Sequence, residues 1–156
     1  MAEKFIEYLE EAERIIKAAD HMVYVTFSII KDKKLLMGIL LEIRKAIINC
    51  INSILQYEHI NKRITLTKNP LTNFKLFSEQ CSKRFEIAEN EIKLMLELFD
   101  LLEKHKQSPF EFTKGDNVII LSDNLKHEKV SIEKTKQFLM LSKSILMKIK
   151  SKIVDK

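Results

Sequence analysis

The chain contains very little glycine, proline or cysteine and no tryptophan, with two Gly, two Pro and two Cys in 156 residues. β-Sandwich and Rossmann domains need more turn glycines than this, so the composition argues against both classes. Gly38 and Gly115 stand alone, which excludes a glycine-rich phosphate loop. Cys50 and Cys81 form neither a CxxC pair nor a Cys/His cluster. We therefore expect a helical protein with no disulfide framework, no metal site and no cofactor.

Signals for secretion or membrane insertion are also missing. Residues 1–4 do not begin the basic and then apolar pattern of a signal peptide. The most apolar stretch, residues 35–55, is long enough to cross a bilayer but carries Glu42, Arg44 and Lys45, which are costly in hydrocarbon. We expect this stretch to be a core helix and the protein to be cytoplasmic, with no membrane partner.

Two long helical patterns fill the first sixty residues. Within residues 3–30 the stripe of helical spacing advances in alternating steps of four and three from Phe5 to Ile30, and within residues 33–61 it does so from Leu36 to Tyr57, after the polar break at 31–34. This spacing places the apolar side chains on one face of each helix. The pattern predicts two long helices that pack as an antiparallel hairpin.

The rest of the chain predicts shorter helices and one small hairpin. Helical spacing recurs over about 71–81 and 87–106, and the last helix begins near residue 130 with Ser131 as its N-cap. A β-rich pattern around a turn cluster predicts a β-hairpin at about 109–122. Because an isolated hairpin is marginal in water, its apolar face must lie on the bundle or on another copy. We expect one all-α domain, residues 1–156, built as an antiparallel bundle of four to five helices.

Charge is distributed unevenly along the chain. The net charge is +5, but residues 1–32 hold four basic and seven acidic side chains, whereas residues 126–156 hold nine lysines and three acids. These lysines cover the outside of the last helix, and the candidate nucleic-acid-binding residues are Lys134, Lys136, Lys143, Lys148, Lys150 and Lys152. Such a face binds phosphate backbones without reading their sequence. The basic and acidic ends could equally pair with each other across the bundle or between subunits.

The last helix lacks one feature of proteins that bind single strands specifically. Those proteins interleave aromatic side chains with basic ones so that bases can stack. Phe138 is the only aromatic residue in this helix, and its position on the apolar stripe predicts that it faces the core. If the face binds a partner, the sequence favours electrostatic docking on RNA, a ribonucleoprotein or an acidic protein, without recognition of a base sequence. A solvated lysine-rich face that binds no partner is an equal alternative.

One face of the first helix carries Arg14, Lys17, His21 and Tyr24 in steps of three, four and three. An Arg and a His near a carboxylate can bind a phosphate and move a proton. The simpler interpretation is a solvated polar face, on which Glu13 and Lys17 form an ordinary helix ion pair. We favour the simpler interpretation.

The second helix has a polar side within an otherwise apolar sequence. Asn49, Asn52 and Gln56 are spaced three and four residues apart. Amides that are partly buried must find hydrogen-bond partners. They could line a ligand groove or form a seam between subunits, but bonds to neighbouring helices are the simpler interpretation, which we favour.

The segments Tyr8–Ile16 (YLEEAERII) and Ile43–Asn49 (IRKAIIN) resemble the first helical hairpin of HEPN-type proteins. These are small helical bundles, often dimeric, and many members are metal-independent ribonucleases or nucleotide-binding modules. Their catalytic signature is an Arg followed a few residues later by a His, and six residues separate Arg14 from His21. This pair lies in the first helix instead of late in the bundle, so the resemblance implies an inactive relative. The chain also looks like small helical proteins of archaeal type.

Three hypotheses of function follow from these patterns. The first is a non-enzymatic binding module that docks on RNA or a ribonucleoprotein through the lysine-rich last helix. The second is a HEPN-like ribonuclease or toxin that uses Arg14 and His21. The third is a structural homodimer, with the hairpin or the second helix as its seam.

Overall fold

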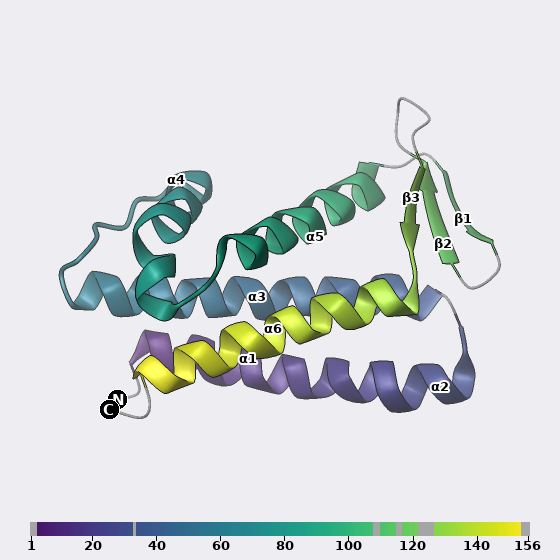
Figure 1. The fold of residues 1–156 in the computed structure, drawn as a ribbon, viewed down its shortest axis with the longest axis horizontal. Coiled ribbons are helices and arrows are strands. Elements are labelled where there is room, and N and C mark those ends of the chain that lie inside the picture. The colour runs from purple at the N-terminus through teal and green to yellow at the C-terminus, as the bar shows by residue number, and fades with distance from the viewer. Residues whose placement is uncertain (1–2, 33, 108–109, 115–116, 122–126, 154–156) are drawn as a thin grey trace.

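The computed structural model describes residues 3–32, 34–107, 110–114, 117–121 and 127–153. Over these residues the fold is the expected all-α bundle, with a small antiparallel sheet inserted before the last helix (Figure 1). None of the described helices combines the length and the apolar character that a membrane span requires.

The predicted helical hairpin is confirmed. Helix α1 (Lys4–His21) continues through a π-helical turn (Met22–Thr26) into α2 (Phe27–Ile30), and α3 (Lys34–Ile60) runs back alongside it. The predicted apolar stripes form much of the core, which includes Leu9, Ala12, Ile16, Ala19, Leu40, Ile43, Ile47 and Ile54. Ile30 was expected on the inner stripe but is 60% exposed, because the helix ends there and Lys31 adopts a left-handed φ of 54°.

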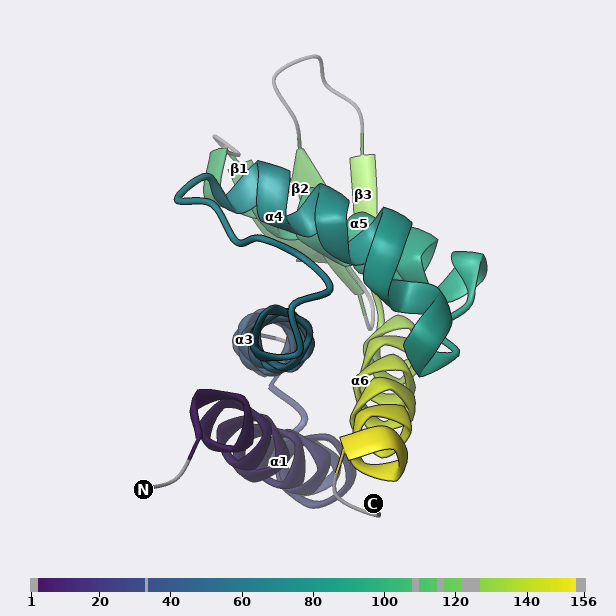
Figure 2. The same ribbon diagram turned by 90° about the vertical axis from the view of Figure 1, so that its left-hand side faces the viewer.

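The segment between α3 and α5 (Glu89–Gln107) contains a short helix followed by two irregular helical turns. Asn69 is the N-cap of helix α4 (Pro70–Leu76), and its side chain accepts a hydrogen bond from the Leu71 N–H at 2.9 Å. The helix continues into a π-helical turn (Phe77–Cys81) and a 3-10 turn (Ser82–Phe85), and α5 follows. Figure 2 shows α4 and α5 on one side of α3 and α1 on the other.

The last helix closes the bundle. Helix α6 (Ile132–Ile153) is capped as predicted, since the Ser131 Oγ accepts a hydrogen bond from the Lys134 N–H at 3.0 Å. It packs against α1, α3 and α5 through the predicted apolar stripe, of which Phe138, Leu141, Ile145 and Ile149 are buried. Ile153, the last residue of the predicted stripe, is only partly buried.

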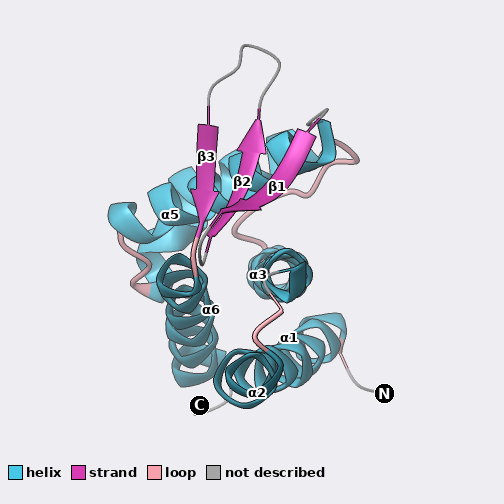
Figure 3. Ribbon diagram, turned by 90° about the vertical axis from the view of Figure 1, so that its right-hand side faces the viewer, coloured by secondary structure: helices cyan, strands magenta, loops and turns pink. Residues whose placement is uncertain are grey.

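The sheet contains the predicted hairpin and one further strand (Figure 3). Strands β1 (Phe110–Lys114) and β2 (Asn117–Leu121) form the hairpin, and β3 (His127–Val130) pairs antiparallel with β2. The sequence did not predict β3, because His-Glu-Lys-Val becomes a strand only through pairing with β2. Val118, Ile120 and Val130 join the hydrophobic core, so the apolar face of the sheet lies on the bundle and not on another copy.

Candidate nucleic-acid interface

Four of the six candidate lysines on α6 are ion-paired within the molecule. Their partners lie on the two helices that flank α6, and the pairs are Lys134–Glu97, Lys143–Asp20, Lys148–Glu91 and Lys150–Glu13. The acidic first helix and the basic last helix therefore do pair across the bundle, which was one of the two alternatives. These pairs are partly exposed, so each stabilises the fold only weakly.

The hydrogen bonds in these pairs favour the charged carboxylates. The Lys150 Nζ donates to a Glu13 oxygen at 2.6 Å, and this bond lowers the pKa of Glu13. Burial raises the pKa of Glu91, but bonds from Lys148, the Ala88 N–H and the Ser144 Oγ outweigh it and leave that pKa lowered. Both acids remain ionised near neutral pH, so they offset part of the positive charge of α6.

Tyr24 supplies the exposed aromatic ring that α6 itself lacks, since Phe138 is buried. It lies in the π-helical turn after α1 and is 48% exposed. The Nζ atoms of Lys136 and Lys143 stand 5.2 and 5.7 Å from the centre of its ring. The sequence placed Tyr24 on a polar face with Arg14 and His21, but the packing of α1 on α6 brings it to the lysines instead.

A groove of about 640 Å³ opens beside Tyr24, between the α1–α2 segment and the start of α6. Its floor contains the buried Val23 and the half-buried Phe27. Lys31 and Lys136 line it from two different helical segments, and Glu133 is the one acid in its lining. We call this cavity the α2–α6 groove. It combines an apolar floor, an exposed aromatic ring and an excess of one positive charge.

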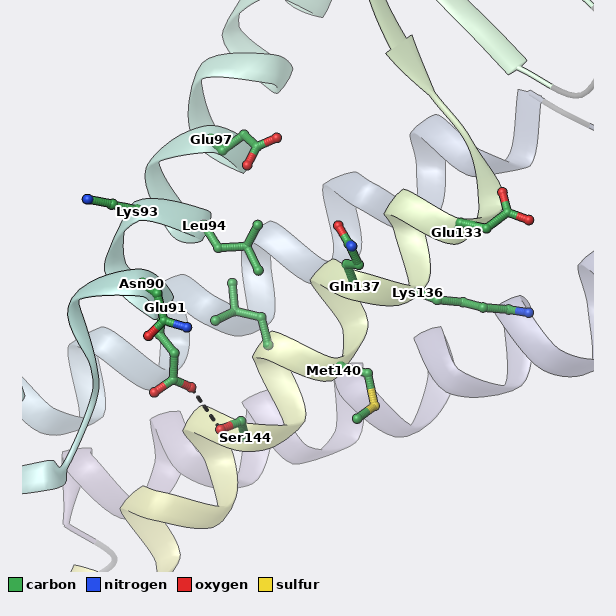
Figure 4. Close-up of a pocket in the computed structure, with 11 residues that line it drawn as sticks. Asn90, Glu91, Lys93, Leu94, Glu97, Glu133, Lys136, Gln137, Met140 and Ser144 are labelled. Carbon is green, nitrogen blue, oxygen red and sulfur yellow. Dashed lines mark hydrogen bonds between the residues drawn. The ribbon is translucent and has the colours of Figure 1, made fainter.

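A second groove, of about 720 Å³, runs between α5 and α6 (Figure 4). Leu94 of α5 and Leu141 of α6 line it, and the Glu91 carboxylate accepts a hydrogen bond from Ser144. Its lining includes three acids against two lysines, namely Glu91, Glu97, Glu133, Lys93 and Lys136. This balance of charge makes it less suited to a phosphate backbone than the α2–α6 groove.

Arg14 and His21 are not brought together. Both are exposed on α1, and the seven residue steps from one to the other correspond to about 10 Å of helix rise. The Arg14 Nε donates to the Glu11 carboxylate at 3.0 Å, which lowers the pKa of Glu11 and raises that of Arg14. Neither residue lines the two grooves described above. The predicted Glu13–Lys17 ion pair is present, at 3.7 Å.

The amides of the second helix have separate surroundings. The Asn49 Nδ2 donates to the Lys45 carbonyl of its own helix at 2.9 Å. Asn52 lines an apolar groove of about 350 Å³ between α3, α4 and α5, together with Ile48, Phe74 and Phe99. Asn52 therefore faces a groove, whereas Asn49 bonds within its own helix and not to the neighbouring helices that we favoured.

One charged cluster was missed by sequence reasoning. Glu58, near the end of α3, is fully buried, and its two carboxylate oxygens accept hydrogen bonds from Arg63 and Arg84. The sequence does contain a signal for the burial of Glu58, because this residue follows Ile47, Ile51 and Ile54 in steps of four, three and four along the buried face of α3. An acid at an inward position requires a charged partner, but the sequence does not say which one.

No protein-family model matches the chain, and no curated protein matches its sequence. Within the described residues, no three His, Cys, Asp or Glu side chains gather so that they could hold a metal ion. Cys50 and Cys81 are free and buried, and burial raises their pKa values to about 12 and about 11.

Proposed function

We propose that the protein is a cytoplasmic, non-enzymatic binding module that holds single-stranded RNA, free or in a ribonucleoprotein, in the α2–α6 groove. The observation that carries this proposal is the half-exposed ring of Tyr24 against Lys136 and Lys143. Proteins that bind single strands combine stacking aromatic side chains with a positively charged groove that follows the backbone.

The lysines of the groove are available for phosphates to different degrees. Among the described residues, no acid forms an ion pair with Lys31 or Lys136, and both line the groove. Lys143 shares its charge with Asp20 and so contributes less. We therefore assign the phosphate contacts to Lys31 and Lys136 and the base contact to Tyr24. Of the six lysines predicted from the sequence, Lys136 thus keeps a phosphate contact, and Lys31 is added from outside the last helix.

The arrangement supports binding without base recognition. The groove offers a stacking ring and two ammonium groups, and any base can stack on a ring. With two phosphate contacts, the logarithm of the affinity should fall with the logarithm of salt concentration with a slope of about −1.4.

The test is fluorescence anisotropy with a short labelled single-stranded RNA at several salt concentrations. Tyr24→Ala should weaken binding about tenfold, because one base–aromatic stack contributes about 1–3 kcal/mol. Lys136→Ala should reduce the magnitude of the salt slope by about 0.7. Arg14→Ala is the matched control, since Arg14 is exposed on the same helical segment and pairs with Glu11. Equal affinity of the wild type and Tyr24→Ala would refute the proposal.

A second candidate function is homodimer formation through α3. Leu41 and Ile48 lie two helical turns apart on this helix and are 37% and 42% exposed, and Ile48 also lines the apolar groove beside α4. Ile48→Glu should split such a dimer without disturbing the core, whereas Val118 and Ile120 are too buried for this test. Light scattering after size exclusion gives the native mass of the wild type and of Ile48→Glu. A monomeric wild type would rule out the homodimer.

A further inference from the structure

The cluster around Glu58 forms a small cleft near the C-terminal end of α3. In Figure 2 this end of α3 faces the viewer. Arg63 comes from the segment after α3, and Arg84 comes from the 3-10 turn before α5. The Arg63 Nη1 lies 2.7 Å from one Glu58 oxygen, and the Arg84 Nε donates to the other. Lys152, at the end of α6, lines the same cleft. Three distant parts of the chain therefore direct positive groups to one place.

The cleft has more positive charge than its acid can balance. Arg63, Arg84 and Lys152 provide three positive charges, and Glu58 is the one acid in the lining. The buried carboxylate thus leaves an excess of two positive charges. The arginine side chains are 43% and 42% exposed although their partner is fully buried. Each guanidinium has five N–H donors, so N–H groups remain on both after the bonds to Glu58.

Glu58 also holds the two guanidiniums in place before any ligand arrives. A carboxylate that bonds one group of each arginine restricts both side chains, which lowers the entropy cost of binding. Tyr57 and Phe85 form an aromatic wall of the cleft, with ring centres 6.1 Å apart and an edge-to-face orientation. The fork of N–H groups on a fixed arginine matches the oxygens of a phosphoryl group.

We propose that this cleft binds a phosphoryl group through the remaining N–H groups of Arg63 and Arg84 and the ammonium of Lys152. Its volume of about 210 Å³ is smaller than the ~300 Å³ from which sites for whole small molecules begin. It therefore encloses a phosphoryl group and leaves the remainder of any ester outside. The site is independent of the α2–α6 groove, because Lys136 and Lys152 are separated by about 24 Å of helix rise.

The side-chain N–H resonances of arginine give a direct test. The chain has only four arginines, so the Nε–H signals of Arg14 and Arg44 serve as internal controls for those of Arg63 and Arg84. Inorganic phosphate is titrated into ¹⁵N-labelled protein while sodium chloride keeps the ionic strength constant. The signals of Arg63 and Arg84 should shift and saturate together, while the two controls stay in place. No shift, or equal shifts of all four signals, would overturn the proposal.

A lysine variant separates binding from folding. Lys152→Ala removes a charge of the cleft but leaves the bonds to Glu58 intact, so the thermal midpoint should stay near that of the wild type. Its affinity for phosphate should fall about three- to fivefold, as for one partly exposed charge contact. Lys45→Ala is the matched control, because Lys45 is exposed on α3 and pairs only with Glu42 among the described residues. Equal phosphate affinity of Lys152→Ala and Lys45→Ala would contradict the assignment.

The source of the phosphoryl group follows from the same titration with adenosine monophosphate and adenosine. Equal affinities for phosphate and the monophosphate assign the site to free phosphate, and a tighter monophosphate assigns it to a nucleotide ester. Adenosine should leave the Arg63 and Arg84 signals in place. Shifts caused by adenosine alone would overturn the proposal, because the ligand would then be recognised without its phosphoryl group.

Discussion

Replacing Glu58 by Gln tests how the end of the bundle is held together. The substitution keeps the size of the side chain but removes the charge that Arg63 and Arg84 share. Glu58 is fully buried and connects the end of α3 to the segment after it and to the 3-10 turn before α5. The variant should therefore fold but be less stable than the wild type.

The size of the effect follows from the exposure of the partners. Breaking a buried ion pair costs about 3–5 kcal/mol when a charge is left buried without a partner. Here the two arginines reach solvent and can be hydrated, so we expect a smaller loss of about 2 kcal/mol. For a chain of this length, 1 kcal/mol corresponds to about 2–4 °C in the melting midpoint. Glu58→Gln should thus lower the midpoint by about 4–8 °C.

The assay is thermal unfolding followed by circular dichroism, with Glu42→Gln as the control. Glu42 also lies on α3, but it is 42% exposed and stands 3.7 Å from Lys45. Its substitution should change the free energy of unfolding by less than about 0.5 kcal/mol. If the two variants melted at the same temperature, the buried Glu58 carboxylate would not stabilise the fold through Arg63 and Arg84 as we expect.

Three further predictions concern pH, the thiols and catalysis. Because the pKa of Glu91 lies below its ordinary value of 4.5 in the folded state, its ion pair stabilises the fold above that pH and is lost as the pH falls further. In acid unfolding followed by circular dichroism, the stability of Glu91→Gln should fall less steeply with decreasing pH than that of the wild type. An equal dependence on pH in the two proteins would contradict the assignment. Cys50 should resist a thiol reagent at pH 8 until the chain unfolds, because its pKa of about 12 keeps it neutral and its side chain is buried; rapid labelling of the native protein would contradict this. RNA incubated with the protein and a chelator should stay intact on a gel, because Arg14 and His21 are not brought together; cleavage abolished by His21→Ala would instead establish the HEPN-like alternative.

Most of the fold could be predicted from the helical periodicity of the apolar residues. The stripes through Leu40, Ile43 and Ile47 on one helix and through Phe138 and Ile145 on another are buried as predicted, because burial of one helix face is a local property of spacing. Ser131 was likewise predictable as an N-cap from its position before the last helix. Strand β3 could not be predicted, because its residues form a strand only by pairing with β2.

The candidate sites were harder to predict because they join distant segments. Tyr24 and Lys136 are more than a hundred residues apart, and no spacing rule connects them. The lysines of α6 and the acidic first helix were visible in the sequence, but the particular acids that pair with four of the lysines were not. The two arginines around Glu58 follow from tertiary packing in the same way.

The measurement that tests the central proposal most directly is a photocrosslinking map. Single-stranded RNA containing 4-thiouridine is irradiated with the protein, and the crosslinked peptides are identified by mass spectrometry. Binding in the α2–α6 groove predicts that the crosslinks fall in residues 22–31 and 132–143, with Tyr24 among the modified positions. Crosslinks confined to other surfaces, or none at a concentration where RNA is bound, would contradict the proposal.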